Sequence, residues 1–257
     1  MQGYIDSHTH ITNEALDVFE YLKDIEKAKE EGLEKSLLVY TEKEELKSYD
    51  LLKGDHYFDF AAGIFPTYAD RYKEDDLKAL EALLTKEGFV ALGEIGLDYH
   101  WAKKIKDLQK ELFIRQIELA NKLDLPVIIH TREAMGDTYE ILKTHEVKKK
   151  GVIHCFSGSK EMALEFIKLG FYIAFGGTLT YKNNVQGVRA LEAIDLDYLL
   201  CETDAPYLTP VPLRGKRNET ANVRYVYKFI AEHLDIKEEE LIARVKNNYK
   251  RLFLRSR

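Results

Sequence analysis

Short apolar runs alternate with amphipathic stretches along the whole chain. Apolar runs of about six residues are typical of buried strands, and apolar residues spaced three and four apart are typical of helices. The pattern predicts eight strands, at residues 4–6, 36–40, 57–62, 88–94, 125–130, 151–154, 171–175 and 198–203. Strands that alternate with helices in this way indicate an α/β protein built from parallel β–α units. Eight such units in 257 residues favour one closed (β/α)₈ barrel.

The predicted helices each carry one apolar stripe. The first places Leu16, Phe19, Leu22, Ile25 and Ala28 on one side and ends near Gly32. Four more lie near residues 72–86, 113–120, 135–143 and 161–169. Two helices end the chain, with stripes at Val223, Val226, Ile230 and Leu234 and at Leu241, Val245, Asn248 and Leu252. Because no linker, low-complexity tract or internal repeat interrupts the pattern, we predict a single domain spanning residues 1–257.

Composition narrows the class of protein. A hydrophobic content of 45% is ample for a buried core, and the longest apolar runs are far too short to cross a membrane. The first residues lack the basic and apolar regions of a signal peptide. Cys155 and Cys201 both lie in strand-like segments, so we expect them to be reduced and buried. We therefore expect a cytoplasmic protein with no membrane association and no obligate protein partner.

The formal net charge of −6 argues against a broad surface that coats nucleic acid, because such surfaces are normally basic. It does not exclude an enzyme that holds a few phosphates at one site. The local exception is the basic cluster Arg214-Gly215-Lys216-Arg217.

Six side chains that can bind metals lie at the ends of predicted strands. In a barrel these ends converge on one face, where active sites are built. Imidazoles and carboxylates are ligands of divalent transition metals. The six come from the first, fourth, fifth, sixth and eighth predicted strands: His8, His10, Glu94, His130, His154 and Asp204. Together they predict a site for two metal ions.

Each of these residues taken alone has another interpretation. His8 and His10 could lie in an exposed turn, His130 or His154 could be a core histidine, and Asp204 could cap a helix. Glu94 is the hardest to explain in this way, because an ionised carboxylate at the end of an apolar strand is costly unless it is paired or binds a metal.

The sequence around these positions forms a series of blocks in a fixed order. They are Asp6-Ser7-His8-Thr9-His10, Gly93-Glu94-Ile95-Gly96-Leu97-Asp98-Tyr99, His130-Thr131-Arg132-Glu133-Ala134, His154-Cys155-Phe156-Ser157-Gly158, Glu202-Thr203-Asp204-Ala205-Pro206-Tyr207-Leu208 and Arg214-Gly215-Lys216-Arg217-Asn218-Glu219. With Asn248 ahead of Arg251-Leu252-Phe253, they resemble the TatD family of metal-dependent hydrolases. The resemblance covers nearly the whole chain. It implies an amidohydrolase-like TIM barrel with two divalent cations and phosphodiester hydrolysis, often described as deoxyribonuclease activity.

The resemblance also implies roles for the six residues. One metal would be held by His8, His10 and Asp204, the other by His130 and His154, with Glu94 bridging the two. The metals would share a hydroxide that attacks phosphorus, and Asp204 would orient this hydroxide or accept its proton. Glu94 and Asp204 are therefore the expected catalytic residues. Four imidazoles favour zinc or manganese over magnesium, although the family is often assayed with magnesium.

Two positions depart from the family pattern. Phe65 stands in Gly63-Ile64-Phe65-Pro66, where the family commonly reads Gly-Ile-His-Pro, and Thr220 stands where the family commonly has proline. Neither position is one of the six expected ligands. Because Phe65 replaces a histidine of the family pattern, we expect the substrate contacts at that part of the rim to differ from those of the family.

Five residues are candidates for substrate contacts. Arg132 suits bidentate phosphate binding, or it forms a salt bridge with Glu133 or another rim carboxylate. Trp101 could stack on a base, or it simply covers a loop. Backbone N–H groups near Ser157 could bind an anion at a helix start, or Ser159 simply caps that helix.

The basic cluster supplies the other two candidates. Arg214 and Arg217 could hold phosphate near the predicted mouth. Alternatively, Glu202 or Glu219 pins this loop by ion pairs. The sequence leaves both possibilities open.

The leading functional hypothesis is a TatD-type DNase that acts on nucleic-acid ends or small phosphodiesters. A deep mouth suits a chain end better than the middle of a duplex, which favours 3′-to-5′ exonuclease-like action on single strands. The first alternative is hydrolysis of a carboxylic ester or amide, including an aminoacyl ester on tRNA, because the ligand set serves both reactions. The second is a catalytically idle barrel that binds a partner.

Overall fold

The strands form one barrel wall. The computed structural model describes residues 3–11 and 18–254. Its strands are all parallel and pair in sequence order: β1 (Tyr4–Thr9), β2 (Leu33–Tyr40), β3 (Phe58–Ala62), β4 (Phe89–Asp98), β5 (Val127–Arg132), β6 (Gly151–Ile153), β7 (Tyr172–Phe175) and β8 (Leu199–Cys201). The predicted (β/α)₈ fold is confirmed. Each predicted strand overlaps an observed one, although β1 extends to Thr9, β2 begins at Leu33 and β4 extends beyond Glu94 to Asp98.

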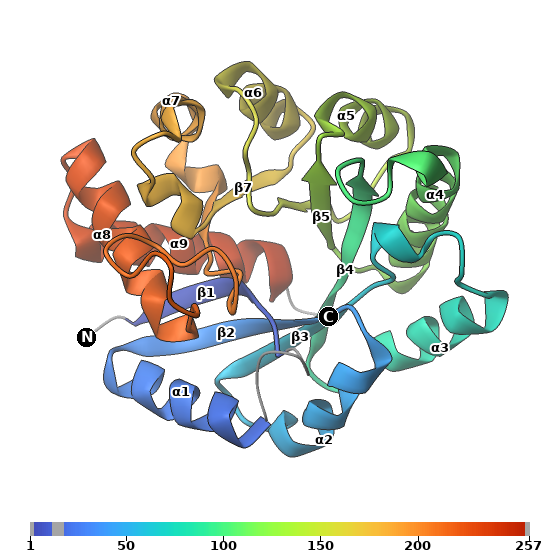
Figure 1. Ribbon diagram of the computed structural model, residues 1–257, viewed down its shortest axis with the longest axis horizontal. Helices are drawn as coiled ribbons and strands as arrows, with labels where there is room; N and C mark the ends of the chain where they lie inside the picture. The colour runs from blue at the N-terminus through green and yellow to red at the C-terminus, as the bar shows by residue number, and fades with distance from the viewer. Residues whose placement is uncertain (1–2, 12–17, 255–257) are drawn as a thin grey trace.

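Helices surround the strands, and all but the last of them lie on the outside of the barrel (Figure 1). They are α1 (Val18–Glu30), α2 (Tyr49–Leu52), α3 (Glu74–Leu84), α4 (Lys106–Leu123), α5 (Met135–Thr144), α6 (Lys160–Lys168), α7 (Val185–Ala193), α8 (Val223–Leu234) and α9 (Glu238–Phe253). Short 3₁₀ turns join several of them: η1 (Lys43–Ser48), η2 (Pro66–Tyr68), η3 (Lys103–Ile105), η4 (Gly177–Thr180), η5 (Leu196–Tyr198) and η6 (Thr220–Asn222). No helix among the described residues has both the length and the apolarity needed to cross a membrane.

Two local predictions need correction. Phe19 of α1 is 65% exposed and Tyr21 is buried in its place, whereas the predicted Ile25 and Ala28 are buried. The three buried positions follow helical spacing, and Leu16 lies outside the described residues. Cys155 does not lie within a strand: it follows β6 with a φ of 45° and is only partly buried. Both cysteines are free, and Cys201 is buried in β8.

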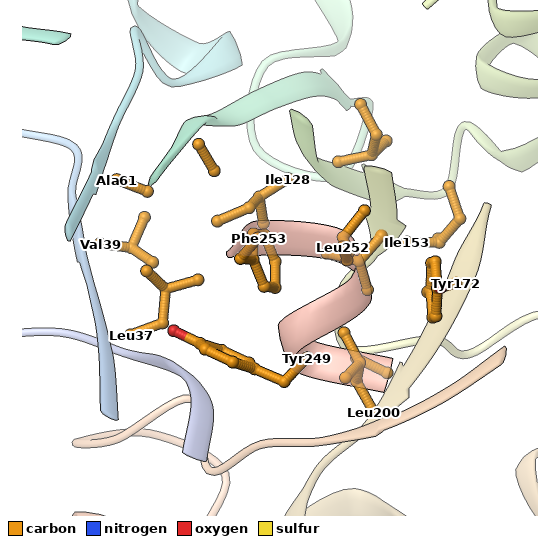
Figure 2. Packing of buried hydrophobic residues seen from close by; sticks show 14 of the residues in the cluster. Leu37, Val39, Ala61, Ile128, Ile153, Tyr172, Leu200, Tyr249, Leu252 and Phe253 are labelled. Atoms are coloured by element: carbon orange, nitrogen blue, oxygen red, sulfur yellow. The ribbon is translucent and has the colours of Figure 1, made fainter. Parts of the chain in front are cut away.

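The last helix closes the end of the barrel where the strands begin. Tyr249, Leu252 and Phe253 of α9 lie among the inward-facing side chains of the strands (Figure 2). The Tyr249 hydroxyl donates to Asp59 Oδ2 at the start of β3 (2.8 Å), and Asn248 Nδ2 donates to the carbonyl of Leu199 at the start of β8 (2.8 Å). The opposite end of the barrel is left for polar side chains.

The barrel closes along what we call the β1–β8 seam, comprising residues 6–10 and 203–205. Thr9 and Ala205 form a parallel bridge, the Asp204 N–H donates to the His8 carbonyl (2.9 Å), and the His10 N–H donates to the Ala205 carbonyl (2.8 Å).

A side-chain latch lies beneath these backbone bonds. The carboxyl group of Asp6, fully buried, accepts from the Thr203 N–H (2.9 Å) and from the Thr203 hydroxyl (2.6 Å). Burial raises the pKa of Asp6 to about 8, even though the hydrogen bonds from Thr203 act in the opposite direction. The Asp6 carboxyl group is therefore costly to bury, and its place in the seam depends on the hydrogen bonds that Thr203 donates.

We expect Thr203→Val to destabilise the protein by about 1–3 kcal/mol, because it leaves a buried acceptor without its hydroxyl donor. The midpoint of urea unfolding, measured on metal-free protein, should fall at an unchanged slope. Thr85→Val is a matched control, since its exposed hydroxyl bonds only to the carbonyl of Ala82 and its loss should cost less than about 0.5 kcal/mol. Equal midpoints for the two variants would contradict the latch.

Candidate metal centre

The six side chains predicted as ligands lie together at the end of the barrel where the strands finish. Glu94 is at their centre: its Oε1 is 2.7 Å from His154 Nε2, 3.3 Å from His8 Nε2 and 3.9 Å from His130 Nδ1. The same Nε2 atom of His8 is 3.0 Å from His10 Nε2. Asp204 Oδ1 is 3.4 Å from His10 Nε2 and 3.9 Å from His8 Nε2.

The possible ligands form three groups, and within each group the ligand atoms all lie within 4.8 Å of one another. One contains His8, His10 and Asp204, and another contains Glu94, His130 and His154. These two groups have the composition that the family resemblance implies for two metals. The third contains His8, His154 and Glu202, and Glu202 is not among the predicted ligands.

Local backbone geometry brings the ligands from neighbouring strands together. At Gly96, with a φ of +134°, a Cβ atom would lie 2.1 Å from the carbonyl oxygen of His130. Only glycine allows β4 and β5 to approach this closely beside Glu94. Asp204 has a φ of 56°, in the left-handed region that aspartate tolerates better than most residues.

The outward-facing nitrogens of three imidazoles are held by fixed acceptors. His10 Nδ1 is 2.9 Å from the Val39 carbonyl, His130 Nε2 is 3.1 Å from Asp98 Oδ2, and His154 Nδ1 is 3.2 Å from Glu202 Oε1. An imidazole that binds a metal is neutral and carries one N–H, so with a metal bound the opposite nitrogen of each ring would present its lone pair to the cluster. This arrangement is characteristic of metal-binding histidines.

The buried charges also suit cations. Burial alone would raise the pKa of Glu94, but the facing rings of His154 and His8 hold it well below its usual range. Burial would likewise lower the pKa of His10, but Asp204 and Glu94 raise that pKa to about 9. The carboxylates are therefore ionised and need positive charge beside them. The nitrogen and oxygen donors, their burial and their orientation fit divalent transition metals.

Two buried carboxylates of the site were given no role there by the sequence analysis. Asp98 contacts His130, and Glu202, named above only as a possible partner of the basic cluster, contacts His154 instead. A signal was present in the spacing, because Asp98 follows Glu94 by four residues and Glu202 precedes Asp204 by two. On an extended strand such residues share a side.

Two of the predicted substrate contacts lie together on the rim. Arg132 is exposed at the end of β5, and its guanidinium carbon is 5.4 Å from the centre of the Trp101 ring. Trp101, in the loop after β4, is 71% exposed. The ion pair considered between Arg132 and Glu133 is absent from the described contacts, since Glu133 pairs with His100 Nδ1 (2.7 Å).

The other candidate contacts are separate from this pair. Ser157 is exposed, and the helix that follows is capped by the Ser159 hydroxyl, which accepts from the Met162 N–H (3.4 Å). Arg214 lies over the Tyr181 ring at 4.2 Å. Arg217 forms an ion pair with Asp24 of α1 (2.8 Å), rather than with either glutamate proposed from the sequence.

The two departures from the family pattern also have clear surroundings. Phe65 is half-buried, and its ring centroid lies 4.7 Å from that of His130 at an interplanar angle of 61°. Thr220 is buried, and its hydroxyl lies 3.2 Å from the hydroxyl of Thr9 in the β1–β8 seam. Phe65 therefore covers one side of a predicted ligand with an apolar ring.

A cleft of about 630 Å³ opens elsewhere on the molecule, beside η1 and α3. Its lining includes Leu46, Ile64, Leu80 and Leu83 and none of the six predicted ligands. It is thus distinct from the polar cluster at the mouth of the barrel.

Comparisons with known proteins agree on one family. A sequence family described as TatD related DNase matches residues 5–254. The uncharacterized metal-dependent hydrolase YabD of Bacillus subtilis is 41% identical, over 96% of this chain and 98% of its own length. The uncharacterized metal-dependent hydrolase YcfH of Escherichia coli is 40% identical, over 97% of this chain and 95% of its own. The crystal structure of YjjV, a TatD homologue from Escherichia coli, matches with a TM-score of 0.92 at 29% identity over 98% of both chains.

We expect added Zn²⁺ or Mn²⁺ to raise the unfolding temperature of chelator-treated protein, because ions that bind only the folded state stabilise it by about 2.7 kcal/mol at 100 times Kd. Glu94→Gln should lower the metal content, since it removes the charge that faces three imidazoles. Elemental analysis and thermal unfolding measure the two effects. Glu44→Gln, on an exposed glutamate, should behave as wild type, and a Glu94→Gln protein with full metal content would contradict this assignment.

Proposed function

Since the chain belongs to the TatD family of metal-dependent hydrolases, we propose that it hydrolyses phosphodiester bonds at the ends of single-stranded nucleic acid or in small phosphodiesters. The observation that carries the proposal is the convergence of four imidazoles on Glu94 and Asp204 at the end of the barrel where the strands finish. An exposed arginine stacked on an exposed tryptophan lies on the rim. The family description supports deoxyribonuclease chemistry, whereas the curated relatives are named only as metal-dependent hydrolases.

We propose that two divalent cations, zinc, manganese or magnesium, bind at the cluster. One would be held by His8, His10 and Asp204, and the other by His130 and His154, with Glu94 shared between them. Bound divalent cations supply Lewis acidity and lower the pKa of water, so that it becomes a nucleophile near neutral pH.

The two carboxylates have different surroundings, which suits different roles. The side chain of Glu94 is 5% exposed and faces three imidazoles, so it serves to hold charge in place. The side chain of Asp204 is 14% exposed and can reach a substrate in the mouth. The hydrogen bond to His10 holds the pKa of Asp204 below its usual value despite burial, which would raise it. An ionised Asp204 carboxylate can therefore accept the proton of the attacking water.

Arg132 and Trp101 would hold the substrate. A guanidinium binds phosphate oxygens in a bidentate manner, and an exposed indole offers a stacking surface to any base. We propose that a chain end enters with its phosphate at Arg132 and a base on Trp101. This one-sided grip suits single strands, and we propose 3′-to-5′ polarity.

The remaining basic residues of the rim contribute little to phosphate binding. Arg217 is neutralised by Asp24, Arg214 lies over Tyr181, and the chain has a net charge of −6. This sparse basic rim leaves carboxylic esters and amides, including aminoacyl esters on tRNA, as the second candidate substrate class.

We expect Asp204→Asn to lower kcat at least about 100-fold, because general-base catalysis contributes at least that factor. The substrates are bis(p-nitrophenyl) phosphate and single-stranded DNA labelled at either end, with p-nitrophenyl acetate for the second candidate. Asp75→Asn, on an exposed aspartate of α3, is the matched control. Hydrolysis of the acetate without cleavage of either phosphodiester would overturn the proposal in favour of esters.

We expect Arg132→Ala to raise KM for single-stranded DNA about 10-fold with little change in kcat, because a charged hydrogen bond contributes about 1.5–3 kcal/mol. Arg217→Ala should have a smaller effect, since Asp24 already binds that guanidinium. Steady-state kinetics at a fixed salt concentration gives both values. A larger effect from Arg217 than from Arg132 would place the phosphate elsewhere on the rim.

A further inference from the structure

Two buried carboxylates stand behind the imidazole cluster and belong to neither proposed metal-binding group. We propose that Glu202 and Asp98 are positioning residues, which fix the ring nitrogen that His154 and His130 present to the centre. The inference rests on the proposed function, because it assigns these two residues to the same metal centre. It adds the prediction that the two histidines present opposite ring nitrogens.

Glu202 is built to hold His154. The residue is 1% exposed, and its Oε1 accepts from the backbone N–H of Cys155 (2.6 Å) and lies 3.2 Å from His154 Nδ1. Its own N–H donates to the carbonyl of Phe175 at the end of β7 (3.1 Å). Glu202 therefore fixes both the ring of His154 and the backbone that follows it.

Asp98 holds His130 in the same way from the opposite side. It is fully buried, and its Oδ1 accepts from the N–H groups of His100 (2.9 Å) and Trp101 (2.8 Å). Gln109 clamps its backbone, donating to its carbonyl (2.9 Å) and accepting from its N–H (2.7 Å). This leaves Oδ2 to contact His130 Nε2 at 3.1 Å.

The two carboxylates select different ring nitrogens. A carboxylate that accepts from one nitrogen of a neutral imidazole fixes the N–H there and the lone pair on the other nitrogen. Glu202 contacts Nδ1 of His154, so Nε2 faces Glu94 at 2.7 Å. Asp98 contacts Nε2 of His130, so Nδ1 faces Glu94 at 3.9 Å.

The effect of Glu202 extends to His8. The His8 ring stacks on that of His154, with centroids 4.0 Å apart and planes 15° apart. Among the described residues, His8 Nδ1 and Glu202 Oε2 are buried without a hydrogen-bond partner. His8, His154 and Glu202 also form one of the compact groups. Glu202 thus contacts His154 and lies near His8, one imidazole of each proposed metal-binding group.

The first experiment measures ¹⁵N shifts of the histidine rings in zinc-loaded wild-type protein. We expect the N–H of His154 on Nδ1 and that of His130 on Nε2, with zinc on the opposite nitrogen of each ring. The same nitrogen bearing zinc in both rings would overturn the proposal. This measurement needs no variant, so it stands even if a substitution prevents folding.

The second experiment compares zinc affinity and stoichiometry by chelator competition. We expect Glu202→Ala and Asp98→Ala to weaken zinc binding about 10–100-fold with unchanged stoichiometry. Glu202→Gln and Asp98→Asn keep an acceptor oxygen and should recover most of this loss. A stoichiometry lowered by one ion in Glu202→Ala would make Glu202 a ligand and overturn its positioning role.

Asp59→Ala is the matched control for general destabilisation. Asp59 is also a buried carboxylate, but it binds Tyr249 and Lys35 at the other end of the barrel. It should lower stability and leave zinc affinity unchanged. If Asp98→Ala and Glu202→Ala both kept wild-type zinc affinity, this inference would be wrong while the proposed function would stand. A wild-type protein that binds neither zinc nor manganese would overturn the proposed function as well.

Discussion

The seam where the last strand meets the first is the contact on which both the barrel and its site depend. The backbone bonds between His8, His10 and the Asp204–Ala205 segment close the wall, and the Asp6 carboxyl group locks it by accepting from Thr203. His8 and His10 lie on one side of this seam and Asp204 on the other. Closure of the fold and assembly of one proposed metal-binding group are therefore the same event. A slip by one residue would turn His8 and His10 away from the mouth.

The buried charges of Glu94 and Asp204 at the mouth of the barrel are not explained by a contribution to the stability of the fold. Glu94 and Asp204 stay ionised only because imidazoles face them, and replacing buried ion pairs by apolar side chains is often neutral or stabilising. The fold therefore bears a cost at this end of the barrel, which the chemistry of a hydrolase accounts for. Asp98 and Glu202 add to the buried charge and hold the rings in one orientation.

The two ends of the barrel differ in how they are filled. At the end where the strands begin, α9 inserts Tyr249, Leu252 and Phe253 into the space between them (Figure 2). At the other end the interior is polar, and exposed loops after β4 and β5 carry Trp101 and Arg132. Trp101 and Arg132, on these exposed loops, are not part of the hydrophobic core.

The sequence by itself determined the order of the eight strands, seven of the helices and the candidate metal-binding residues near the strand ends, because side-chain periodicity and residue type are local properties. It did not predict α2 or α7. A closed barrel then brings the ends of the first, fourth, fifth, sixth and eighth strands together. Only the tertiary structure decided the partners of those residues. Glu202 contacts His154 across the barrel wall, and Arg217 pairs with Asp24 of α1. Such contacts join segments far apart in the chain, and the ring nitrogen that each carboxylate contacts depends on where the folded chain places the carboxylate beside the ring.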